Sequence, residues 1–157
     1  MAEHKDPAEE LRRRVEGQRF VMFSTSRPDG TITSRPMTVR QMEGWTLRFI
    51  TQDDNEVARE AEGQPVNLAI MDGSVYVSLS GTASIQRDAL TKRELWNNLN
   101  EAYAGDPEDP NNVILNVRVH AGEYWDGGNP VVQVLGLAKA AITGDNPPKG
   151  EHDTARV

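Results

Sequence analysis

The residues best suited to bind an anionic ligand lie together in one short segment, Thr33-Ser34-Arg35-Pro36-Met37. A guanidinium can hold a phosphate through a forked pair of hydrogen bonds, and the hydroxyl of Ser34 stands next to it. Because proline has no backbone N–H, Pro36 predicts the edge or a bulge of a sheet, where backbone groups stay available to a ligand. The alternative is that Arg35 only pairs with a surface acid.

Other kinds of chemistry find little support in the residue pattern. The three histidines are far apart and the chain has no cysteine, so we expect no metal site. The sequence contains no nucleophile elbow, Walker loop or dinucleotide-binding glycine motif. The acidic residues of 106–109 indicate a solvated loop, and we name no catalytic acid or base.

The elements that must position this segment are mainly strands. Alternating apolar residues and turn signals predict strands at 20–25, 31–41, 45–51, 66–71, 75–85 and 113–126. Helices are expected at 7–17, at 55–62 and from residue 88 onward, with a short buried helix or interface element at 131–142. Pro28-Asp29-Gly30 joins the first two strands as a hairpin turn, so the Ser-Arg-Pro-Met segment lies on the returning strand.

Size and charge narrow the class of protein further. The 157 residues suffice for one domain, which we place at 1–143, and the few apolar residues of 144–157 predict a disordered tail. The 17 basic and 24 acidic residues give a net charge of −7, which disfavours nucleic acid as a partner. No apolar run approaches the ~20 residues that cross a membrane, and we expect a cytoplasmic protein. The run Arg12-Arg13-Arg14 is expected to be the solvated face of a helix.

Several segments, taken in order, resemble one known family. They are Ser34-Arg35-Pro36-Met37, Leu47-Arg48-Phe49-Ile50-Thr51, Tyr76-Val77-Ser78-Leu79-Ser80-Gly81, Glu94-Leu95-Trp96-Asn97, Glu123-Tyr124-Trp125-Asp126 and Val132-Gln133-Val134-Leu135-Gly136. The order and spacing are similar to those of the pyridoxamine 5'-phosphate oxidase-like split barrels, and more narrowly to their general stress protein branch. The resemblance implies a mainly β split barrel of the flavin-binding type, with about six strands and three or four helices.

The resemblance also implies a cofactor and a site. In that family flavin mononucleotide (FMN) lies in a cleft between the two subunits of a homodimer. The residues of this chain that match the site are Ser34, Arg35, Pro36, Met37, Ile50, Thr51, Asn55, Tyr76 and Trp125. Arg35 and Ser34 would hold phosphate or ribityl oxygens, and Met37 and Ile50 would offer backbone groups beside the ring. FMN is expected ahead of flavin adenine dinucleotide (FAD) or a deazaflavin.

The chain departs from the family pattern just after Thr51. Asp53, Asn55 and Val57 stand where the pattern has an Arg, a Ser and a Lys, so two cations are lost and one acid is gained. Two like charges ~4 Å apart cost about 4 kcal/mol at an effective dielectric constant of about 20. Asp53 or Asp54 could instead cap the following helix. A second hypothesis therefore stays open, a dimeric binding or scaffold protein that has lost the flavin.

Glu123-Tyr124-Trp125-Asp126-Gly127-Gly128 resembles the Glu-Phe-Trp-Gln-Gly-Gly of the true oxidases. In those enzymes the Trp borders the flavin, and a nearby Arg and His help to hold pyridoxal phosphate. Here the next residues are Asn129, Pro130 and the apolar start of 131–142. We therefore expect no pyridoxamine phosphate oxidase activity, and Trp125 is equally suited to anchor a core or an interface.

Overall fold

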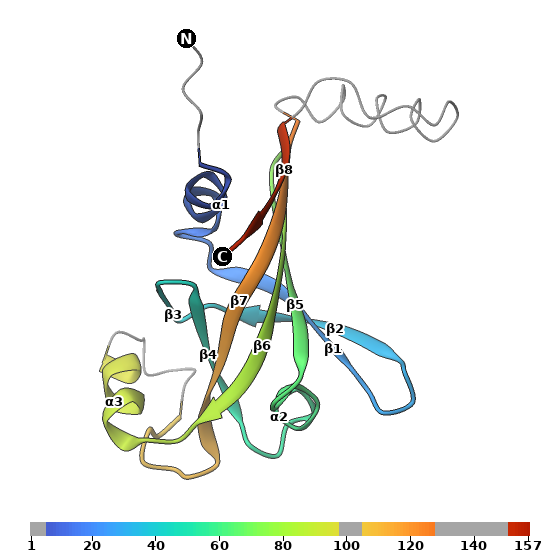
Figure 1. Ribbon diagram of the computed structural model, residues 1–157. Helices are drawn as coiled ribbons and strands as arrows, with labels where there is room; N and C mark the ends of the chain where they lie inside the picture. Colours follow the sequence, from blue (N-terminus) through green and yellow to red (C-terminus); the bar gives the residue numbers. More distant parts are fainter. Residues whose placement is uncertain (1–5, 98–104, 128–150) are drawn as a thin grey trace.

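The computed structural model describes residues 6–97, 105–127 and 151–157. Strands dominate these residues, and three helices lie around them (Figure 1). The elements are α1 (Pro7–Val15), β1 (Phe20–Ser26), β2 (Ile32–Thr38), β3 (Gln41–Glu43), β4 (Thr46–Gln52), α2 (Glu56–Ala61), β5 (Pro65–Asp72), β6 (Val75–Gln86), α3 (Ala89–Asn97), β7 (Asn112–Asp126) and β8 (Glu151–Arg156). No described helix has the length and apolar character needed to span a membrane.

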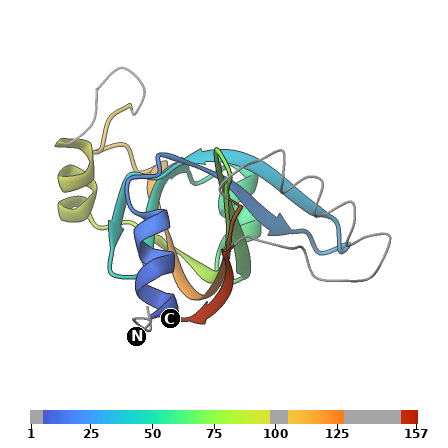
Figure 2. The ribbon, with the colours of Figure 1, turned by 90° about the horizontal axis from the view of Figure 1, so that it is seen from above.

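The strands form one antiparallel sheet in the order β2-β1-β5-β6-β7-β4-β3, and β8 pairs with β7. Seen from above, the sheet curls around a common centre, with β1 and β2 on one side and β4 and β7 on the other (Figure 2). The described residues contain eight strands where about six were expected. The predicted strand at 31–41 is divided into β2 and β3, and the C-terminal residues add β8.

The core lies inside the curled sheet and follows from the alternation of the strands. In β1, Val21 and Phe23 are buried while Phe20 and Met22 are exposed on the opposite face. The ring of Phe23 meets that of Phe49 on β4 edge to face, with centroids 5.3 Å apart. The inner faces of β1 and β4 are thereby held together across the barrel.

Helix α1 closes one end of this core. Asp6 accepts a hydrogen bond from the backbone N–H of Ala8 at the start of the helix, and Leu11 and Val15 are buried on one face, as predicted. The expectation that Arg12-Arg13-Arg14 is only a solvated face is wrong for Arg14, whose side chain is 7% exposed. Its guanidinium lies 4.1 Å from the ring centroid of Tyr124 and pairs with Asp126 at 3.1 Å.

The expectation of a disordered tail is wrong for residues 151–156, which form β8. Strand β7 is 15 residues long, and β4 pairs only with its first half, up to Arg118. Strand β8 pairs with the second half, from Ala121 to Asp126, and runs beside α1 (Figure 1). Composition misled the prediction because a sheet ladder is made by backbone groups, which polar residues also supply. The element expected at 131–142 lies outside the described residues.

Candidate functional site

The predicted ligand-binding segment forms β2, which stands at the end of the sheet order. Among the described strands β1 is its only neighbour, so the edge position predicted from Pro36 is confirmed. In the ladder Pro36 stands opposite Met22 and Arg35 opposite Phe23. Alternation therefore turns Arg35 and Met37 toward the barrel interior and Ser34 and Pro36 toward its outer face.

On the inner face, Arg35 reaches helix α2. Its Nη2 donates to Oε2 of Glu60 at 3.1 Å, and its Nη1 donates to Oγ1 of Thr25 at 2.6 Å. The side chain of Glu60 is 8% exposed and also accepts from Nε of Arg27 at 2.8 Å. Arg35 is thus paired with an acid, but with a nearly buried one on a neighbouring helix rather than with a surface acid.

The Thr25 hydroxyl, which donates to Glu60, is the main cause that lowers the pKa of this carboxyl below its usual value. The guanidiniums of Arg27 and Arg35 lower this pKa further, while burial opposes the shift. Glu60 is therefore ionised at neutral pH. Sequence reasoning missed Glu60, because it is one acid among several in an acidic helix and nothing in its spacing points to β1 or β2.

The start of α2 also differs from expectation. Asn55 is the N-cap residue, and no side chain caps the helix, so the prediction that Asp53 or Asp54 caps it is wrong. Asp53 accepts from Nη2 of Arg87 at 2.8 Å, and Asp54 accepts from the side chain of Asn111 at 3.2 Å. Side chains outside α2 hold both carboxylates, which turns them away from its N–H groups.

Asn55 and Thr51, both predicted site residues, contact each other at this end of the barrel. The Asn55 amide donates to Oγ1 of Thr51 at 3.2 Å, and Thr51 is buried. Val57, which stands where the family pattern has a Lys, is buried in the core against the strands. Position 57 therefore points away from solvent, and a cation there would be buried.

These contacts test whether the surroundings of α2 suit a phosphate dianion. Arg35 and Arg27 are both paired with Glu60, and Arg87 is paired with Asp53. A phosphate would compete with a carboxylate for each of these cations, and α2 has only six residues to contribute a dipole. Arg27, Arg35 and Arg87 are therefore not free to hold a phosphate group.

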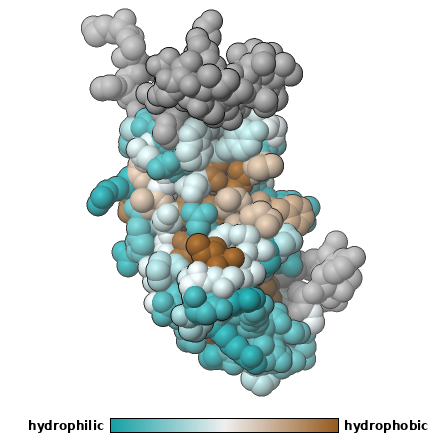
Figure 3. Space-filling model, turned by 90° about the vertical axis from the view of Figure 1, so that its right-hand side faces the viewer, coloured by the Kyte–Doolittle hydropathy of each residue, from teal (hydrophilic) through white to brown (hydrophobic). Residues whose placement is uncertain are grey.

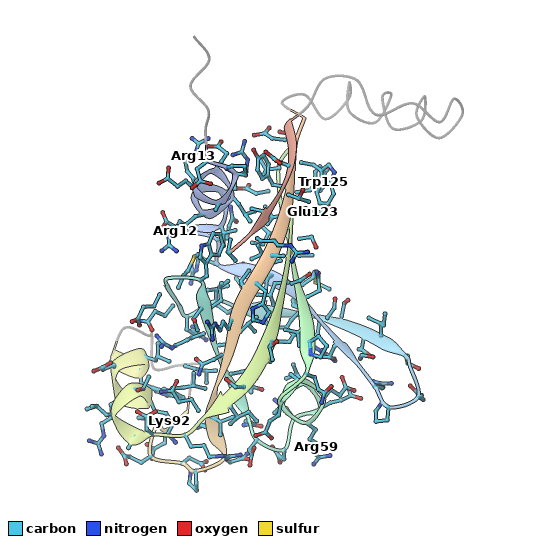
Figure 4. All side chains as sticks on the ribbon, in the orientation of Figure 1. Arg12, Arg13, Arg59, Lys92, Glu123 and Trp125 are labelled. Atoms are coloured by element: carbon cyan, nitrogen blue, oxygen red, sulfur yellow. The ribbon has the colours of Figure 1, made fainter. Side chains whose placement is uncertain are left out.

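The remaining predicted site residues lie elsewhere. Tyr76 on β6 and Trp125 on β7 are cross-strand neighbours on the outer face. Trp125 lies at the end of the long strands beside α1 and β8, whereas Arg59 marks α2 at the opposite end (Figure 4). Ile50 packs against the small apolar cluster of Leu95, Trp96 and Ile114. One chain therefore brings Arg35, Thr51 and Asn55 together around α2 but leaves Trp125 far from them.

The outer face carries a cavity of about 340 Å³ near the edge strand. It is lined by residues of β1, β2, β5, β6 and β7, among them Ser24, Ile32, Asn67, Thr82 and His120. The hydroxyls of Ser24 and Ser34 lie 2.5 Å apart at its border, and Thr82 contacts Nε2 of His120 at 2.9 Å. Sequence reasoning missed His120, because its contact with Thr82 joins residues 38 positions apart.

Large apolar side chains are exposed on the same outer face. Phe20, Met22, Ile32 and Met71 belong to β1, β2 and β5, and Met71 is 78% exposed. The side of the molecule that carries the β1–β2 hairpin shows hydrophobic surface between hydrophilic regions (Figure 3). Exposed apolar surface of this kind is typical of an interaction site.

The curled antiparallel sheet with three helices defines the split-barrel class. A crystal structure from Jannaschia sp. CCS1 superposes with a TM-score of 0.68 over 96% of this chain and 98% of its own, at 24% identity. The model of the family described as "Pyridoxamine 5'-phosphate oxidase like" matches residues 6–148, and the chain belongs to this family.

Two further solved structures resemble the chain at slightly higher identity. The general stress protein 26 of Bacillus anthracis is 28% identical, with a TM-score of 0.63 over 74% of this chain and 91% of its own. The general stress FMN/FAD binding protein of Xanthomonas citri is 27% identical, with a TM-score of 0.63 over 74% and 89%. No curated protein matches the chain.

Proposed function

We propose that this protein is a flavin-binding homodimer of the general stress type, acting as an oxidoreductase or redox carrier without pyridoxamine phosphate oxidase activity. The observation that carries the proposal is the position of β2, which contains Pro36, at the edge of the described strands in a chain of this family. The related protein of Xanthomonas citri, described as FMN/FAD binding, supports a flavin as the ligand. The flavin would supply the redox chemistry, and the protein would supply position and burial.

Two features support a site shared by two copies of the chain. Trp125 lies at the other end of the long strands from α2, so a ligand that touches both Trp125 and the Arg35 end needs a second chain (Figure 4). The exposed Phe20, Met22 and Met71 would be buried by such a partner. Ser34 and Pro36 on the outer face, with the cavity beside them, would then lie at the subunit interface.

The visible absorbance of the purified protein, followed by titration with FMN, tests the proposal. We expect flavin absorbance after purification, or quenching of FMN fluorescence when the protein is added. A colourless protein that leaves the fluorescence of added flavin unchanged would contradict it.

A second candidate function is a dimeric binding or scaffold protein without a flavin. The pairing of Arg35 with Glu60 and of Arg87 with Asp53 favours this candidate, because these cations are then not available to a flavin phosphate. The same titration distinguishes the two, since a scaffold protein would form the dimer and leave the flavin unbound.

A further inference from the structure

The nearly buried carboxylate of Glu60 is relevant to which kind of flavin this protein can hold. FMN and riboflavin share the same ring and ribityl chain and differ by one phosphate group. A site that binds FMN through its phosphate needs a cation or N–H donors that are not already satisfied. The comparison of these two flavins therefore reports directly on the cations around α2.

Arg35 is predicted to hold phosphate or ribityl oxygens, and its terminal nitrogens are already used. Nη2 donates to Glu60, and Nη1 donates to Thr25 and, at 3.4 Å, to the carbonyl of Phe23. The Arg35 side chain is 19% exposed and the Glu60 side chain 8%. Turning Arg35 toward a phosphate would leave a buried carboxylate with fewer partners, which carries a large cost.

The other described charges near α2 do not replace Arg35. Arg27 also pairs with Glu60, and Asp53 holds Arg87. Arg59 is exposed and extends into solvent at the lower end of α2 (Figure 4). The ionised Glu60 would in addition repel a phosphate that came within reach of Arg35.

We propose that Glu60 neutralises the phosphate-binding arginine of this chain, so that the site takes a flavin through its ring and ribityl chain and accepts riboflavin as readily as FMN. This proposal rests on the proposed flavin-binding function. Under this proposal Glu60 is a specificity-determining residue, and the ligand is a flavin that need not carry a phosphate.

Parallel fluorescence titrations of the full-length protein with riboflavin and FMN test the proposal. We expect the two dissociation constants to agree within about threefold, because no favourable contact with the phosphate is gained. The FMN affinity should stay constant or rise when NaCl increases from about 50 to 500 mM, since salt screens repulsion. FMN binding about tenfold or more tighter than riboflavin binding would overturn the proposal, because other cations or the uncapped N–H groups of α2 would then hold the phosphate.

The substitution Glu60→Gln tests the residue itself. It removes the negative charge while keeping a side chain of the same shape, so Arg35 becomes available and FMN affinity should rise about tenfold or more with little change for riboflavin. Glu62→Gln is the matched control, because Glu62 is exposed at the end of the same helix and carries the same charge. The control should leave both affinities unchanged.

The outcomes distinguish a failure of the proposed role of Glu60 from a failure of the proposed flavin-binding function. An unchanged FMN affinity in folded Glu60→Gln protein, checked by circular dichroism, would overturn the role of Glu60 while leaving flavin binding intact. If that variant does not fold, the ratio of the two affinities and their salt dependence in the unsubstituted protein still decide. Binding of neither flavin by either protein would overturn the proposed flavin function itself.

Discussion

Single carboxylates organise both ends of this barrel. At one end Glu60 gathers Thr25, Arg27 and Arg35 around α2. At the other end Glu10 accepts hydrogen bonds from Arg13 and Arg14 on α1. Both carboxylates are nearly buried, and both have arginines within hydrogen-bonding distance, so each is held in its charged form.

Glu10 gives a prediction at the scale of one residue. Its hydrogen bonds from Arg13 and then from Arg14 lower its pKa from 4.5 to about 2. Because the pKa is lower in the folded state, this stabilisation is present above pH ~4.5 and is lost as the pH falls toward about 2. Glu10→Gln should lower the free energy of unfolding by about 2 to 3 kcal/mol at pH 7 and by much less near pH 2.

Urea unfolding followed by circular dichroism, at pH 7 and at about pH 2, measures this difference. Glu9→Gln is the control, because Glu9 is exposed on the same helix turn. An equal loss of stability at both pH values in Glu10→Gln would contradict the charge-based explanation.

At the scale of elements, two glycines allow the long strands to approach their neighbours. Strand β6 changes register with β7 between Ser80 and Gly81. A Cβ built on Gly81 would lie 2.4 Å from the carbonyl oxygen of Arg118, and one on Gly122 would lie 2.5 Å from Cδ2 of Leu11. The first neighbour is rigid backbone, and the second is the end of a flexible side chain.

We therefore expect the two alanine substitutions to differ. Gly81→Ala should destabilise the protein by about 2 to 3 kcal/mol, because the β6–β7 ladder must shift. Gly122→Ala should cost less, about 1 to 2 kcal/mol, because the ends of the buried Leu11 and Leu79 side chains can shift more easily than a backbone carbonyl. Urea unfolding of the two variants measures both values. A larger loss of stability for Gly122→Ala would show that the packing of α1 against β7 tolerates less extra volume than the contact between β6 and β7 at Gly81.

The C-terminal strand gives a second prediction at this scale. Deletion of residues 151–157 removes β8 and leaves β7, from Ala121 to Asp126, without a paired strand on the side opposite β6. An open strand edge promotes association with other chains, so the truncated protein should have a lower melting temperature and should scatter more light on heating. Thr154→Ala, which keeps the backbone ladder, is the control and should behave like the unsubstituted protein. A truncated protein with unchanged melting would show that β8 contributes little.

At the scale of the whole molecule, the outer face is expected to be the dimer interface. Met22→Asp combined with Met71→Asp places two charges on this exposed apolar face, and a charge buried between subunits is costly. By light scattering coupled to size-exclusion chromatography, we expect a monomer for this variant and a dimer of 17.4 kDa chains for the unsubstituted protein. Leu90→Asp is the matched control, because Leu90 is 68% exposed but lies on α3, away from this face. A dimer that survives the double substitution would place the interface elsewhere.

Local signals in the sequence were enough to predict the mainly β fold and most element positions. The alternation in β1 and β6 and the turn at Pro28-Asp29-Gly30 are local signals, because side chains alternate every two residues and turn types depend on a few neighbours. Pro36 likewise predicted an edge strand, because the missing N–H is a property of that one residue.

The groups that Arg35 meets on the inner face of β2 follow from the folding of distant segments and could not be predicted locally. Arg35 and Glu60 are 25 residues apart, and alternation reveals which side chains share a face but not which group meets them across the barrel. The burial of Arg14 against Tyr124 and Asp126 and the pairing of β8 with β7 likewise depend on contacts between distant segments. Long-range packing sets the partner of each charge, and the partner decides whether an arginine can bind a ligand or is already neutralised.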